Sequence, residues 1–232
     1  MASKKAFFCF GPTGSGKGTL AGILAEVFGV TNFDTGRILE ALLHDPASQD
    51  DPVILRERAL FDGKMLNTPQ FVLSEVVLKQ ARLIAAGSSG GIVYSGSPRT
   101  MDEAKVLIPL LEELYGKENM HFFFLDVSPQ VAIARNTKRL TCGNCISPIP
   151  VQYYASGDPE TCPRCQSKLY RREVDVGSAQ ELEIRLQQFR DRTLPILGYL
   201  EDTGHVVHKI DASQESHKVL FDVLMCFEDD LS

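Results

Sequence analysis

A glycine-rich segment at residues 11–19, Gly-Pro-Thr-Gly-Ser-Gly-Lys-Gly-Thr, follows directly on the short apolar run Ala6–Phe10 and precedes a helical pattern. Glycines let a backbone curl so that successive N–H groups point at one anion, and a helix beginning near Lys17 adds its positive dipole end. The Lys17 ammonium adds a full charge, and Thr19 offers a hydroxyl near a metal ion. The predicted phosphate-binding residues are Gly14, Ser15, Gly16, Lys17, Gly18 and Thr19. An ordinary turn of small residues is the alternative, which the ordered strand, glycines, lysine and helix disfavour.

Strand-like and helical patterns alternate along most of the chain. The runs at 92–95, 121–127 and 206–211 are strand-like, and 121–127 is continuously apolar, as expected for a strand buried on both faces. This alternation indicates an α/β fold with a parallel sheet covered by helices on both faces. Ligands bind such sheets at the carboxyl ends of the strands. The phosphate loop and the turns near 95–100 and 126–129 fall there. Helices are expected at about 20–28, 37–44, 69–86, 102–115, 129–139, 179–200 and 216–227.

Four of the six cysteines form two C-x-x-C pairs, Cys142 with Cys145 and Cys162 with Cys165. Two such pairs separated by 16 residues are typical of a tetrahedral thiolate site for zinc. A disulfide is the alternative, but nothing in the sequence indicates a secretory signal. Because no histidine or open ligand lies nearby, we expect a structural zinc that stabilises an insert too small to bury a core of its own.

Composition and charge limit the classes of protein. The 232 residues are 44% hydrophobic, which is enough for one sizeable core, and no apolar stretch approaches the length of a membrane span. The formal net charge of −6 argues against general nucleic-acid or membrane-surface binding. Residues 135–172 contain seven Lys or Arg and only two acids, which suggests a local anion site or a solvated basic surface. We expect a cytoplasmic protein.

These motifs together resemble a bacterial-type adenylate kinase with a zinc-bearing lid, a nucleoside monophosphate kinase. The similarity extends over nearly the whole chain, and its motifs occur in the family's order. They are the G-x-x-G-x-G-K-G-T loop, Thr35-Gly36, Gly63-Lys64, Gly-x-Pro-Arg-Thr at 96–100, Leu-Asp-Val-Ser at 125–128, the four-cysteine lid and Lys-Ile-Asp at 209–211.

The resemblance implies a three-layer P-loop kinase core with a five-stranded parallel sheet, formed by residues 1–33, 67–134 and 176–232. A helical insert at 34–66 would close over the monophosphate, and a zinc-bearing lid at 135–175 would close over the triphosphate. Such closure excludes water and protects the phosphoryl group from hydrolysis. A monomer is the expected state, with ATP and a monophosphate as its ligands.

The resemblance also implies roles for individual side chains. Lys17 and the loop amides would hold the outer phosphates of ATP with its magnesium, and Arg135 would pack on the donor adenine. Arg99 would bind the acceptor phosphate, because a guanidinium pairs with phosphate oxygens and always stays charged. Three arginines would surround the transferring phosphoryl group, namely Arg139, Arg172 and Arg185. The implied monophosphate site comprises Thr35, Gly36, Met65, Leu66, Gly96, Arg99 and Glu103.

The chain departs from the family mainly around the acceptor and the metal. Ser95 stands where the family has an aspartate that helps to hold the water shell of magnesium, so catalysis is weaker or another acid substitutes. The family's Thr-Gly-Asp-x-x-Arg is Thr-Gly-Arg37-x-x-Glu40 here, with the two charges exchanged. Glu103 replaces a glutamine that contacts adenine. An ionised carboxylate only accepts hydrogen bonds, so it favours a base edge that offers donors, such as guanine's. The lid's Asp-Asp pair is Val174-Asp175.

Several functions remain open at this stage. The first is a kinase that converts ATP and AMP into two ADP, and the second is a kinase for another monophosphate, suggested by Glu40 and Glu103. A third, suggested by Ser95, is a nucleotide-binding protein with impaired catalysis. A zinc-ribbon nucleic-acid binder is disfavoured by the acidic remainder of the chain and the complete phosphate loop.

Overall fold

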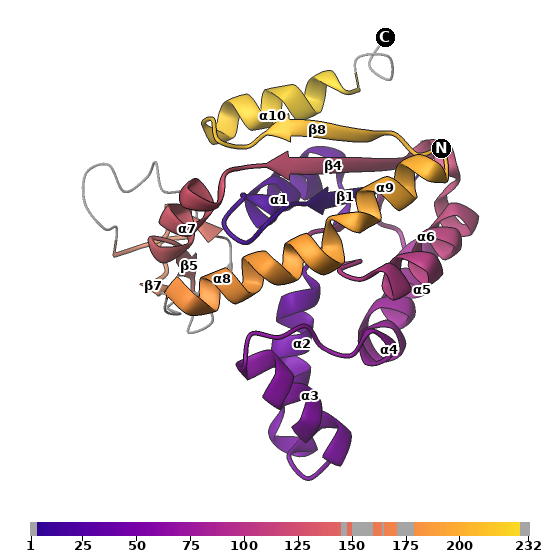
Figure 1. Cartoon of the computed structure of the whole chain (residues 1–232). Helices are drawn as coiled ribbons and strands as arrows, with labels where there is room; N and C mark the ends of the chain where they lie inside the picture. The colour runs from indigo at the N-terminus through magenta and orange to yellow at the C-terminus, as the bar shows by residue number, and fades with distance from the viewer. Residues whose placement is uncertain (1–3, 145–147, 150–159, 164, 171–178, 228–232) are drawn as a thin grey trace.

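The computed structural model shows a five-stranded parallel sheet with helices on both faces (Figure 1). It describes residues 4–144, 148–149, 160–163, 165–170 and 179–227. The strand order is β2-β3-β1-β4-β8, so β1, which leads into the phosphate loop, lies in the centre. The strands are β1 (Lys5–Phe10), β2 (Thr31–Phe33), β3 (Gly91–Tyr94), β4 (Met120–Asp126) and β8 (Val207–Asp211). The α/β class and the five-stranded parallel sheet are confirmed.

The central strand supplies side chains to both faces of the sheet, as its period of two requires. Phe8 packs between the rings of Tyr94 and Phe122, with ring centroids 5.1 and 4.7 Å away, on one face. Phe7 and Cys9 belong to the core of the other face. A strand buried on both sides has no solvent face, which explains the apolar continuity of β1 and β4.

Two groups of helices cover the sheet. Helices α1 (Lys17–Phe28) and α10 (Ser216–Met225) pack on the Phe7 face. Helices α5 (Leu78–Ala86), α6 (Met101–Tyr115) and α9 (Pro195–Asp202) pack on the Phe8 face. None of the helices in the described part of the chain combines the length and apolarity that a membrane crossing requires.

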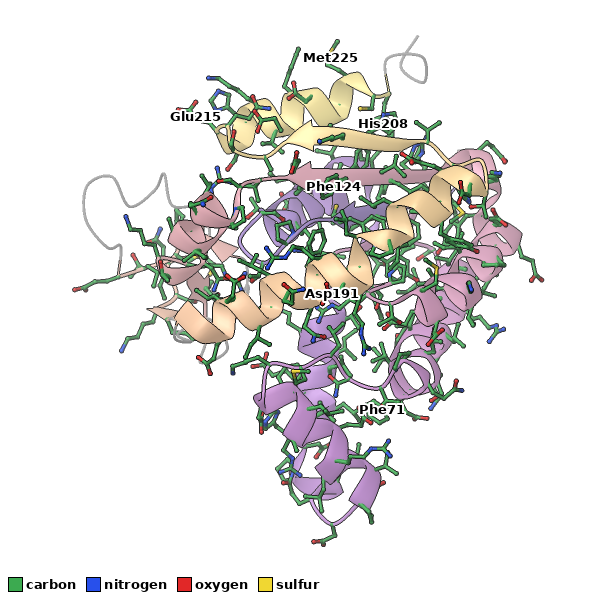
Figure 2. The ribbon with its side chains drawn as sticks, in the orientation of Figure 1. Phe71, Phe124, Asp191, His208, Glu215 and Met225 are labelled. Atoms are coloured by element: carbon green, nitrogen blue, oxygen red, sulfur yellow. The ribbon has the colours of Figure 1, made fainter. Side chains whose placement is uncertain are left out.

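One long helical run in front of the sheet comprises three consecutive elements (Figure 1). They are α8 (Ala179–Gln188), the π-helical turn η6 (Phe189–Thr193) and α9. Within this run the ring of Phe189 stacks on Phe124 of β4, with centroids 6.2 Å apart. Figure 2 labels Phe124. The expected helix at 179–200 is therefore present, with a wider turn in its middle.

The segment 34–66 projects away from the sheet as a helical insert (Figure 1). It contains α2 (Thr35–Leu43), a 3₁₀ turn, η1 (Pro46–Ser48), and α3 (Pro52–Asp62). Both helices begin at an aspartate, because the side chains of Asp34 and Asp51 accept hydrogen bonds from the first free backbone N–H groups. The chain then returns to the core through α4 (Pro69–Phe71) and the π-helical turn η2 (Val72–Val77).

The second insert follows α7 (Pro129–Thr137) and contains a small antiparallel sheet. Strand β5 (Leu140–Cys142) pairs with β6 (Pro148–Ile149) on one side and β7 (Leu169–Tyr170) on the other. Sequence patterns did not indicate these strands, since two or three residues are too few to show a period. Elsewhere in the chain, the 3₁₀ turn η3 (Lys117–Asn119) precedes β4.

Candidate functional site

A cleft of about 510 Å³ opens at the carboxyl edge of the sheet, between the two inserts. The phosphate loop lies in its middle, and both inserts contribute to its walls. The predicted site residues that line it are Gly14, Ser15, Gly16, Lys17, Gly18, Thr19, Gly36, Met65, Leu66, Gly96, Arg99, Arg135, Arg139 and Arg185. Arg172 lies outside the described residues. Thr35 and Glu103 do not line the cleft.

The phosphate loop connects Phe10, the last residue of β1, to Lys17, the first residue of α1. Gly14 has φ +82°, and a Cβ there would lie 2.1 Å from the carbonyl oxygen of Ala132 in α7. Only glycine therefore allows the loop to pack against α7. The hydroxyl of Ser15 is buried without a hydrogen-bond partner, a state that is costly unless a ligand supplies one.

Lys17 lies within this loop and folds back onto it. Its Nζ donates hydrogen bonds to the carbonyl oxygens of Gly11 and Pro12, each at 2.7 Å. Burial, followed by the positive charges of Arg99, Arg185 and Arg139, lowers the pKa of Lys17 to about 7. The site therefore disfavours the charged amine until an anion enters.

The cleft is positive although the whole chain is acidic. Among the described residues, six cationic side chains line it, namely Lys17, Lys64, Arg99, Arg135, Arg139 and Arg185. Within the same part of the chain, the acidic residues that line it are Asp34 and Glu215. Such an excess in one concave site favours a ligand with several negative charges.

The half of the cleft that the resemblance assigns to the acceptor, hereafter the acceptor half, contains Arg99. Its guanidinium lies close over two glycines, since a Cβ at Gly96 would be 3.1 Å from Arg99 Nη2 and one at Gly36 would be 3.5 Å away. Thr35 is buried, and its hydroxyl donates to Ser97 Oγ at 3.0 Å. Thr35 thus joins the insert to the turn that carries Arg99, rather than facing the cleft.

Glu103 has a local role that sequence reasoning did not anticipate. Its carboxylate accepts hydrogen bonds from the backbone N–H of Arg99 at 2.9 Å and from Thr100 Oγ1 at 3.3 Å. Thr100 in turn accepts from the N–H of Glu103. This is a variant of the capping box at the start of α6, in which the glutamate accepts from the N–H of Arg99 rather than from that of the N-cap Thr100. The T-x-x-E spacing could have indicated it. Burial is the largest influence on the Glu103 carboxyl and raises its pKa.

The donor half includes the loop between β8 and α10. The Arg135 guanidinium donates to the carbonyl oxygens of Ala212, Ser213 and Gln214, the last two at 3.0 and 3.1 Å. In this structure Arg135 therefore holds the loop that forms one end of the cleft. Glu215, labelled in Figure 2, begins the helix that follows this loop.

Three thiols converge in the second insert. The sulfur atoms of Cys142, Cys162 and Cys165 lie within 4.8 Å of one another, and the backbone N–H of Asn144 donates to Cys142 Sγ at 3.3 Å. Four thiolates at about 2.3 Å from a zinc ion would be separated by similar distances. The donor set therefore fits zinc. Cys145 lies outside the described residues.

Two residues that line the cleft carry no functional signal in the sequence. Thr193 Oγ1, in η6, donates to the carbonyl oxygen of Arg99 at 2.8 Å, which ties the long helix to the acceptor arginine. Asp34 lines the cleft beside Ser95, because Phe33 and Tyr94 are paired in adjacent parallel strands and the next residues leave the sheet together. Asp34 was recognisable only as the start of a helix.

A phosphate loop at the carboxyl end of a central parallel strand, facing a cleft rich in arginine, defines a P-loop protein that handles phosphate esters. Comparison with known proteins agrees, since a family model described as "AAA domain" matches residues 10–144. The adenylate kinase of Magnetococcus marinus is 30% identical to this chain over 92% of the chain and 95% of the relative. That of Chlamydia pneumoniae is 29% identical over 97% and 99%, and that of Bacillus licheniformis 29% over 92% and 93%.

These matches extend over nearly the full length of each protein. The chain belongs to the adenylate kinase family, and it is a P-loop phosphotransferase. The resemblance drawn from the motifs is thereby confirmed at the level of the family.

The lowered pKa of Lys17 predicts that triphosphate binding takes up a proton. With a pKa of about 7, roughly nine-tenths of the Lys17 amines are neutral at pH 8. Bound phosphates favour the ammonium and raise the pKa, so ATP binding at pH 8 should take up close to one proton, and less at pH 6.

Calorimetric titration in buffers of different ionisation enthalpy measures this uptake. Lys17→Arg, which stays charged at both pH values, should abolish it while retaining a positive side chain. Equal uptake by the Lys17→Arg variant would assign the proton to another group.

Proposed function

We propose that the chain transfers the γ-phosphoryl group of ATP to a nucleoside monophosphate, with AMP as the acceptor. The observation that supports this most is the single continuous cleft, which contains both the phosphate loop and Arg99. Donor and acceptor phosphates bound at these two places would meet between Arg139 and Arg185. The named activity of the relatives supports AMP as the acceptor.

The arginines supply what this reaction requires. Phosphoryl transfer depends on alignment and on stabilisation of charge on the moving group, and little on a protein acid or base. Lys17 and the loop amides would bind the outer phosphates of ATP, and Arg99 would orient the acceptor phosphate. Arg139 and Arg185 would neutralise the charge that develops between them, and Arg172 is proposed to join them.

The expected residues of the monophosphate site are proposed in two groups. Gly36, Met65, Leu66, Gly96 and Arg99 would contact the acceptor directly, because they line the cleft. Thr35 and Glu103 would act through the loop that bears Arg99. Glu103 thus gives no support to an acceptor base other than adenine.

Ser95 supports a second candidate, a nucleotide-binding protein with weak catalysis. This side chain is nearly buried and lines the cleft without a charge.

A panel of acceptors distinguishes the two candidate functions. Purified protein is incubated with ATP, magnesium and each of AMP, GMP, CMP, UMP and dTMP, and diphosphate formation is quantified. We expect turnover with AMP at least tenfold above the others. Binding of ATP without turnover on any acceptor would favour the second candidate.

Magnesium bound with ATP would be held near Thr19 and Asp34, which line the same cleft. The ion would supply positive charge to the β- and γ-phosphates. The carboxylate oxygens of Asp34 are hard ligands suited to magnesium or to its bound water. Asp34 is thereby the proposed substitute for the aspartate that Ser95 replaces.

Asp34→Asn tests this assignment cleanly, because asparagine caps a helix as well as aspartate and only the charge is removed. We expect the factor by which magnesium strengthens ATP binding to fall about fivefold, with the melting temperature unchanged. Titrations with and without magnesium measure it. Glu215→Gln, which neutralises the other acid of the cleft, is the matched control, and equal losses in the two variants would argue against a special role of Asp34.

Zinc is proposed to hold the second insert through Cys142, Cys145, Cys162 and Cys165. Reduced protein should bind one zinc ion, and removing it with a chelator should lower the melting temperature by on the order of 5 °C. Cys142→Ser should weaken zinc binding more than tenfold. Cys226→Ser is the control, because that thiol donates to the carbonyl oxygen of Asp222, outside the cluster. Stoichiometric zinc in the Cys142→Ser variant would contradict the assignment.

A further inference from the structure

Glu57 is a buried carboxylate in α3, within the sequence Arg56-Glu57-Arg58. The side chain of Glu57 is 0% exposed, whereas that of its neighbour Arg56 is 62% exposed. A carboxylate is rarely buried so completely unless it is paired and hydrogen-bonded. Glu57 does not line the cleft, so the reaction does not explain its burial.

Both oxygens of Glu57 accept hydrogen bonds from the segment that follows α3. Oε2 accepts from the backbone N–H of Thr68 at 2.9 Å and from Asn67 Nδ2 at 3.1 Å. Oε1 accepts from Thr68 Oγ1 and from Arg56 Nη2, the latter at 2.8 Å. Asn67 Nδ2 also donates to the backbone oxygen of Glu57 at 2.7 Å. The carboxylate therefore has donors on both oxygens.

The side chain of Thr68 does not cap the helix that follows it. It occupies the N-cap of α4, where a threonine side chain commonly accepts a backbone hydrogen bond, but no such bond forms here. Its hydroxyl donates to Glu57 instead. The residues at the exit of the insert are thus bound to α3.

The segment held in this way forms a wall of the acceptor half of the cleft. Lys64, Met65, Leu66 and Asn67 all line the cleft. Lys64 has φ +62°, a backbone conformation that is strained for a residue other than glycine. Backbone bonds from Lys64 to Phe61 and from Met65 to Leu60 attach the start of this segment to α3, and Glu57 attaches its end.

We propose that Glu57 is a positioning residue that makes the segment 64–68 and helix α3 one rigid unit, so that the acceptor wall is preformed. The proposal rests on the proposed function, because it assigns this wall to the monophosphate. Burial alone raises the pKa of the Glu57 carboxyl, but the hydrogen bonds from Thr68, Asn67 and Arg56 outweigh it, and the pKa lies below its ordinary value. The group is therefore an ionised acceptor at neutral pH.

Glu57→Gln is the principal test, because it keeps the shape but places an NH₂ group opposite donors. We expect amide hydrogen exchange over residues 64–68 to become about tenfold faster, with α1 and β1 unchanged. AMP affinity should fall about tenfold, while ATP affinity in the absence of acceptor stays within twofold, since the phosphate loop is not touched. Both affinities are measured by calorimetry on the full chain. Glu75→Gln, an exposed carboxylate paired with Lys79 at 2.8 Å, is the matched control and should change neither quantity.

Thr68→Val provides a second variant. It removes the hydroxyl that donates to Glu57 and keeps the donors of Arg56, Asn67 and the backbone N–H of residue 68. It should weaken AMP binding in the same direction but less, and its effect should not add fully to that of Glu57→Gln. If Glu57→Gln fails to fold, the AMP affinity of Thr68→Val tests the proposal alone. Unchanged AMP affinity in a folded variant, even with faster exchange, would overturn the proposal. Failure of the wild-type protein to bind any monophosphate would overturn the proposed function itself, and with it this inference.

Discussion

Mutual repulsion among the cations of the cleft is the constraint on which the rest of the structure depends. In the part of the chain that the structure describes, six Lys and Arg side chains line one cavity together with two acids. Each like charge brought within a few ångströms of another costs free energy in the absence of ligand. Burial is the largest cause of the lowered pKa of Lys17, and the positive charges of Arg99, Arg185 and Arg139 lower it further. The phosphates that the cleft attracts would relieve this repulsion.

The surrounding structure keeps these cations in place through bonds to neutral groups. Lys17 donates to carbonyl oxygens of its own loop, and Arg135 donates to three carbonyl oxygens before α10. The backbone of Arg99 is held from two sides, by Glu103 at its N–H and by Thr193 at its carbonyl. Since the carbonyl partners of Lys17 and Arg135 are neutral, they order these two side chains without cancelling their positive charge.

The parts that depend on local sequence were predictable. The strand, glycine loop and helix at 5–28 are contiguous, so the order of residues determines their geometry. The parallel sheet followed from the alternation of strand-like and helical patterns, and the apolar continuity of 121–127 indicated a strand buried on both faces. Strand β2 could not be predicted by its own pattern, because three residues show no period, and it is placed by pairing with β3. The burial of Glu57 could not be predicted from the sequence either. A glutamate between two arginines is typical of a solvated helix face, and two of its hydrogen-bond partners lie 10 and 11 residues away. The role of Glu103 was not predicted, although the spacing of Thr100 and Glu103 is local. The resemblance assigned Glu103 to the acceptor base, whereas its carboxylate binds Arg99 and Thr100.

A lysine with a pKa of about 7 is also an unusual nucleophile. At neutral pH about half of the Lys17 amines carry a free electron pair, whereas an ordinary surface lysine has roughly one in a thousand in that form. The Lys17 amine therefore combines a large neutral fraction with hydrogen bonds to two carbonyl oxygens of its own loop. The arrangement that prepares the loop for phosphate makes this residue more open to acylation and imine formation than an ordinary lysine, and a bound phosphate would protect it.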